Sequence, residues 1–116
     1  MLNERLEKDL EVALKSMEIS GVKSEILRSY MITKKEGAPE LLILDMFWGR
    51  ELEEMLEYLK DAGVNNFIIE REGMASINTL SYLMNNGCKI VAASERKTEN
   101  WAGKDKIVKG LVISIV

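Results

Sequence analysis

The chain of 116 residues contains no histidine, no glutamine and a single cysteine. Without histidine it cannot form a Ser-His-Asp triad, a Cys-His dyad or a histidine-ligated zinc site, which excludes much of ordinary hydrolase chemistry. The single cysteine, Cys88, has no partner for an internal disulfide, and its small and apolar neighbours favour a buried structural role over a reactive thiol. The lack of glutamine, with abundant Glu, Lys and Ile, resembles the composition of hyperthermophile proteins.

Long apolar runs are lacking as well. The longest have four residues, as in Leu-Leu-Ile-Leu at 41–44, far fewer than the roughly 20 residues that span a bilayer. Charged residues interrupt the N-terminal segment, so no export signal is visible, and we expect a cytoplasmic protein with no membrane partner. A hydrophobic fraction of 47% and a charged fraction of 30% are typical of a globular protein, and the length predicts one domain over residues 1–116.

The formal net charge of −3 is unevenly distributed along the chain. Residues 37–86 hold nine acidic and three basic residues, whereas residues 87–116 hold three acidic and six basic ones. The acidic middle argues against a nucleic-acid-binding central face, because such a face needs cations to neutralise phosphates. The basic end leaves nucleic acid, or the acidic middle of a second copy, as a conceivable partner. Its basic loop consists of Arg96, Lys97, Lys104 and Lys106.

Hydrophobic periodicity predicts an N-terminal helix over residues 3–17, with Asn3 as its N-cap. The β-branched and aromatic content of residues 26–33 predicts a strand, which would pair as an antiparallel hairpin with the strand at 41–47. Helical stripes then alternate with continuous apolar runs, which are typical of strands buried on both faces. The helix that follows residue 71 should bury Ile77, Leu80, Leu83 and Met84. The remaining expected elements are a helix over 50–63, strands over 66–70 and 88–94, and a last strand over 107–116.

These elements predict an α/β fold in two or three layers. The mixed sheet should have about five strands, with a parallel βαβαβ unit over residues 41–94 at its centre. The polar segment that follows residue 94 should connect this unit to the last strand. That strand is apolar on both faces, so it either inserts into the sheet or has its edge covered by a partner.

The carboxyl ends of parallel strands form the usual ligand crevice of such folds. Three residues should lie at these ends and three more just beyond them, although none belongs to a recognised motif. The candidate crevice residues are Asp45, Glu70 and Ser94, followed by Trp48, Arg71 and Glu95.

Two functions remain open. The first is a binding or interaction domain without a cofactor, which forms a homo-oligomer through its C-terminal strand. The second is a Mg²⁺-dependent phosphoesterase or nuclease, in which Asp45 and Glu70 would hold the metal. The missing catalytic equipment and the apolar terminal strand favour the first.

Overall fold

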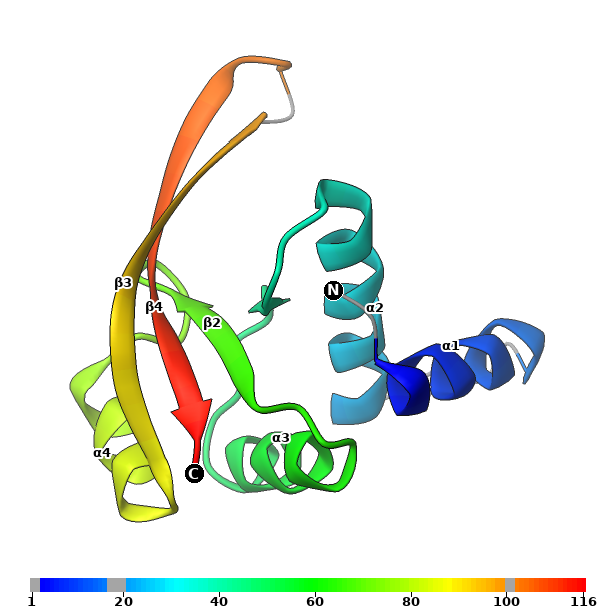
Figure 1. Ribbon diagram of the computed structural model, residues 1–116, viewed down its shortest axis with the longest axis horizontal. Helices are drawn as coiled ribbons and strands as arrows, with labels where there is room; N and C mark the ends of the chain where they lie inside the picture. Colours follow the sequence, from blue (N-terminus) through cyan, green and yellow to red (C-terminus); the bar gives the residue numbers. More distant parts are fainter. Residues whose placement is uncertain (1–2, 17–20, 100–101) are drawn as a thin grey trace.

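The computed structural model describes residues 3–16, 21–99 and 102–116 (Figure 1). Within them the chain forms four helices and a sheet of four strands, so the predicted α/β class is confirmed. None of these helices is long and apolar enough to cross a membrane. The elements in chain order are α1 (Glu4–Ser16), α2 (Val22–Glu36), β1 (Leu41–Ile43), α3 (Arg50–Asp61), β2 (Asn66–Glu70), α4 (Ile77–Asn85), β3 (Cys88–Glu99) and β4 (Asp105–Ile115).

The sheet has the strand order β1-β2-β4-β3. β1 and β2 are parallel neighbours, as predicted, but β4 lies between β2 and β3 and is antiparallel to both. The continuous βαβαβ unit and the five-strand count are therefore wrong, although β3 still runs in the direction of β1 and β2. The apolar C-terminal strand has inserted into the sheet, which was one of the two alternatives for it.

The segment at 26–33, predicted as a strand, belongs to helix α2, so the expected hairpin with β1 does not form. The buried apolar residues of α2 recur at helical spacing: Val22, Ile26, Leu27 and Tyr30. Its β-branched content expresses only a weak preference, which burial of this helical face overrides. The helix ends at Gly37, which adopts the left-handed conformation at φ 69°.

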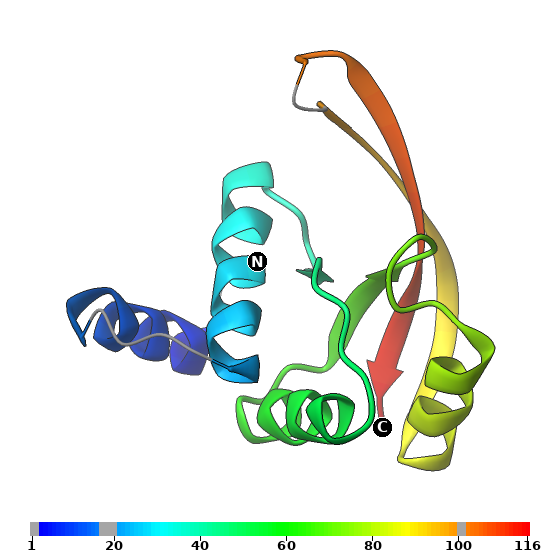
Figure 2. The ribbon, with the colours of Figure 1, turned by 180° about the vertical axis from the view of Figure 1, so that it is seen from behind.

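β3 and β4 continue through most of the segment predicted to be a polar connection. Beyond the row formed by Ser94 and Gly110, these two strands pair only with each other within the described residues. This two-stranded ribbon, residues 95–99 and 105–109, is called the arm below. Figures 1 and 2 show that it projects from the sheet and curves over the end of α2.

The main core lies between one face of the sheet and the helices. Leu41, Phe67 and Ile113 from three strands are buried there. The apolar stripe of α3 is buried with them: Leu52, Met55, Leu56 and Leu59. In α4 the structure buries Thr79 and Leu83, whereas Ile77 is 82% exposed and Met84 57% exposed. The predicted burial of those two residues is wrong, because the helix turns by about 100° per residue and Thr79 with Leu83 faces the core.

Candidate functional site

The predicted crevice residues lie in three places. Trp48 belongs to the β1–α3 connection, and Glu70 and Arg71 lie at the end of β2. Ser94 lies within β3, in register with Gly110 and, across it, with Glu70. Since directly paired residues share a sheet face, Glu70 and Ser94 face the same side across a glycine. Glu95 follows Ser94 in the strand and so points to the opposite face.

Asp45 is held by helix α2. Its carboxylate is 16% exposed and forms an ion pair with the Arg28 guanidinium. One helical position further, the Ser29 hydroxyl accepts a hydrogen bond of 3.2 Å from the backbone N–H of Leu44. The connection that follows β1 is thus held against α2 by a backbone hydrogen bond at Leu44 and an ion pair at Asp45.

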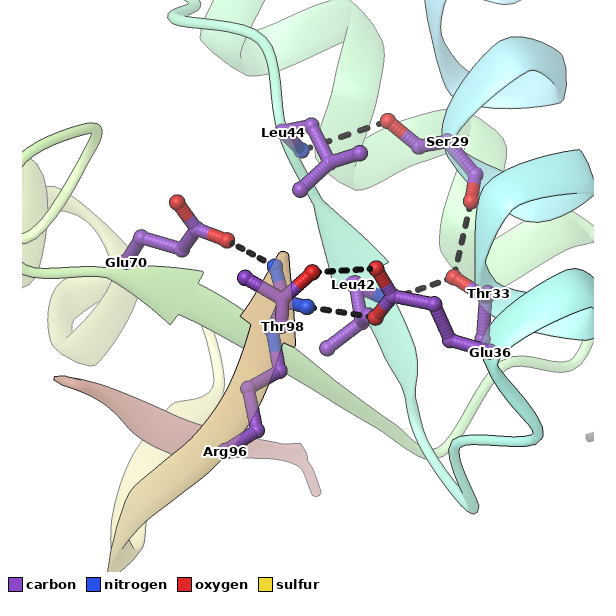
Figure 3. A network of polar contacts seen from close by, with 8 residues as sticks. All are labelled: Ser29, Thr33, Glu36, Leu42, Leu44, Glu70, Arg96 and Thr98. Atoms are coloured by element: carbon purple, nitrogen blue, oxygen red, sulfur yellow. Dashed lines mark hydrogen bonds and ion pairs between the residues drawn. The ribbon is translucent and has the colours of Figure 1, made fainter. Parts of the chain in front are cut away.

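Glu70 belongs to a separate polar network that joins three elements (Figure 3). Its Oε1 accepts a hydrogen bond of 2.7 Å from Nη2 of Arg96, whose Nη1 pairs with Glu36 at the end of α2. Glu36 also accepts a hydrogen bond of 3.2 Å from the Thr98 hydroxyl. Arg96 therefore fastens the arm to β2 and α2, and it is engaged inside the fold rather than presented with the other basic residues of the loop.

The same helix covers the outer edge of β1. The backbone N–H of Leu42 donates to Oγ1 of Thr33 at 2.9 Å, and the Thr33 hydroxyl donates to the carbonyl of Ser29 at 2.7 Å. Figure 3 shows both hydroxyls turned toward the strand. Two side chains four residues apart on α2 thus replace part of a missing neighbouring strand. In the sequence these are two small polar residues inside an apolar helical stripe. The signal was missed because the segment was predicted to be a strand.

The carboxylates proposed as magnesium ligands each have a different cationic partner. Asp45 pairs with Arg28 and Glu70 with Arg96, so their charges are balanced by side chains of two separate elements. Among the described residues no group of three or more acidic or cysteine side chains is placed to hold a metal ion. The magnesium site therefore stays a prediction that no geometric observation favours.

Two openings flank the carboxyl edge of the sheet. One lies between the start of α3 and α4 and has a volume of about 330 Å³. The other lies beside the arm, where the turn after β2 faces β4, and has a volume of about 260 Å³. The first is lined by Phe47, Trp48, Gly49, Leu52, Glu53, Asn78, Thr79 and Tyr82. The second is lined by Glu70, Arg71, Glu72 and residues 106–109.

Cys88 is buried at the start of β3, as predicted for a structural cysteine. Burial raises the pKa of its thiol, while the nearby Lys60 ammonium lowers it less. A raised pKa keeps the side chain a neutral thiol, which is a poor nucleophile. The geometry therefore favours packing over reactivity at this position.

These features define a mixed α/β domain with a projecting ribbon and paired, rather than free, carboxylates. The chain belongs to the family described as "Domain of unknown function (DUF7698)", which matches residues 25–115. Helix α1 and the first turn of α2 lie outside the matched range. A search of curated proteins and a search of solved structures found no match.

Proposed function

We propose that the protein is a non-catalytic interaction domain that self-associates through the outer edge of its C-terminal strand. The observation that carries this proposal is the uneven pairing of β4. Residues 110–114 pair with β2 on one side and β3 on the other, whereas residues 105–109, among the residues that the structure describes, pair in register only with β3. An unpaired strand edge is a template for another strand, which would add to the sheet by main-chain hydrogen bonds.

The direction of the backbone groups supports this edge as the binding element. The carbonyl of Lys109 accepts a hydrogen bond of 2.8 Å from the N–H of Arg71, on the β2 side of the strand. Because residues two apart in a strand point their polar groups to the same side, Asp105 and Ile107 present theirs to that outer edge. The Ile107 side chain is also 58% exposed there.

The pairing of the acidic residues supports a binding role rather than catalysis. Asp45 and Glu70 both take part in ion pairs that hold α2 and the arm in place. A general base or metal ligand needs a carboxylate that can reach a substrate or a cation. In their present positions these two groups stabilise contacts between elements of the fold.

Proline at position 107 tests the proposal. Ile107→Pro removes an N–H on the outer edge and leaves the hydrogen bonds between β3 and β4, since proline is tolerated at an open strand edge. Sedimentation velocity over a series of concentrations should show a self-associating wild type and a monomeric variant, with the same far-UV circular dichroism for both.

Lys97→Pro is the matched control, because Lys97 is the register partner of Ile107 and points its N–H to the other edge of the arm. This variant should still self-associate. A monomeric wild type, or association that is lost in Lys97→Pro and retained in Ile107→Pro, would overturn the proposal.

A further inference from the structure

The opening at Trp48 combines aromatic rings with a carboxylate. Of the eight residues that line it, three are aromatic and one is acidic, and none of these eight is basic. Phe47 is buried and forms the floor, Tyr82 is half-buried, and Trp48 is 55% exposed. Residues of α3 and of α4 line the opening. Figure 2 shows the first turn of α3 on the side of α4. A large exposed indole beside two further rings is an unusual surface to leave without a contact.

The charge around this opening favours a cation. Glu53 lines it directly, and Glu51 belongs to the same first turn of α3. Arg50 also belongs to this turn, and the amino end of a helix carries about half a positive charge, which together the two carboxylates still exceed. Burial raises the pKa of the Tyr82 hydroxyl, and the neighbouring Glu53 carboxylate raises it further, so the negative field reaches the ring. A phosphate or carboxylate ligand would be repelled here.

We infer that this opening binds an organic cation, an ammonium or guanidinium group, through the faces of Trp48 and Tyr82 and the carboxylate of Glu53. The faces of aromatic rings attract cations within about 6 Å, and alkylated ammonium groups are recognised by such clusters. The carboxylate supplies the opposite charge. The volume of about 330 Å³ accommodates a small amine or the end of a lysine or arginine side chain. This inference goes beyond the proposed function, since the opening does not include the edge of β4.

Tryptophan fluorescence provides the test. In a Trp101→Phe background the emission reports on Trp48 alone. Choline chloride should shift this emission with a saturable, millimolar dependence after correction against sodium chloride. The control ligand is 3,3-dimethyl-1-butanol, which has the shape of choline without its charge and should bind about fivefold more weakly or worse.

Two glutamate variants separate a charge effect from general damage. Glu53→Gln should weaken choline binding about fivefold, because it removes the carboxylate that lines the opening. Glu54→Gln should leave binding unchanged, because Glu54 lines a different opening on the other side of α3. Both glutamates are exposed, so neither change should affect folding.

Equal binding of choline and the neutral alcohol, equal effects of the two variants, or no saturable shift would each overturn the inference. Titration with the blocked amides of lysine and arginine distinguishes the sources of the cation, since tighter binding than choline indicates a side chain of a protein partner. Ile107→Pro should bind choline like the wild type. Failure of self-association and failure of cation binding are therefore measured separately.

Discussion

The attachment of α2 to the edge of β1 predicts a large effect for Thr33→Val. Thr33 is fully buried, and its Oγ1 is the acceptor for the backbone N–H of Leu42, which is also fully buried. Valine has nearly the shape of threonine, so the change leaves no cavity. It does remove the acceptor, and the N–H of Leu42 then lies in the interior without a partner.

The magnitude follows from the cost of that N–H. A buried donor left unsatisfied costs about 1–3 kcal/mol, and we take about 2 kcal/mol for a fully buried amide. A protein of this size gains only about 5–15 kcal/mol on folding, so the change removes a substantial fraction of its stability. From the average unfolding entropy per residue, the loss corresponds to a fall of roughly 8 °C in the melting temperature.

Urea unfolding followed by far-UV circular dichroism measures this loss, and Thr79→Val is the matched control. Thr79 is also buried on a helix, but its Oγ1 accepts from the hydroxyl of Ser76, which can rotate to another acceptor. The control should therefore lose less than about 1 kcal/mol. If the two variants unfold at the same urea concentration, the hydroxyl of Thr33 does not support the strand edge as described.

Two further predictions concern backbone contact and pH. In Gly110→Ala the new Cβ would lie 2.5 Å from the carbonyl oxygen of Ile69, so β4 must shift. We expect the free energy of unfolding, measured by thermal denaturation, to fall by about 1–3 kcal/mol. Gly73→Ala, whose new Cβ has its nearest contact at 3.5 Å, should lose much less. Burial raises the pKa of the Asp9 carboxyl, but hydrogen bonds from Tyr58 and Arg5 outweigh this and leave it below its usual value. A lowered folded pKa stabilises the fold above the unfolded pKa and ceases to do so as pH falls through the folded pKa. Tyr58→Phe should therefore reduce stability at neutral pH, and urea midpoints measured across pH should converge with those of the wild type below about pH 4; a constant difference would contradict this linkage.

Part of the fold was predictable because it depends on local patterns. Helices α1 and α3 carry clear apolar stripes, and Asn3 caps α1 as predicted, through a hydrogen bond of 2.9 Å from the N–H of Leu6 to its side chain. β2 is a short apolar run between turn residues. In each case the pattern and the burial agree, so the sequence alone locates the element.

The failures occur where a distant segment decides the structure. Residues 26–33 have strand-like composition, yet their helical face buries Leu27 and Tyr30. The polar residues after Ser94 continue as strand because β4 pairs with them residue by residue, and Arg96 reaches Glu36, 60 positions away in the chain. Periodicity contains no information about such pairings.

In the candidate site, too, local features are predictable from the sequence and contacts with distant segments are not. Local pattern predicts Asp45 and Glu70 at the ends of the first two strands; Glu70 ends β2, whereas Asp45 lies two residues beyond the end of β1. Their ion-pair partners, Arg28 and Arg96, come from elements that the pattern misassigned. A pair of free carboxylates and a pair of structural ion pairs therefore look identical in the sequence, although they have different chemistry.

The central position of β4 also limits how strongly the protein can self-associate. Had the whole strand been an open edge, a partner could have paired along 11 residues. Because β2 occupies residues 110–114 and Arg71 already donates to Lys109, the outward groups left for a partner are those of Asp105 and Ile107. Each main-chain hydrogen bond contributes only about 0.5–1.5 kcal/mol net, and association has its own entropic cost. Self-association through this edge should therefore be micromolar or weaker, and it should respond to concentration rather than produce a permanent dimer.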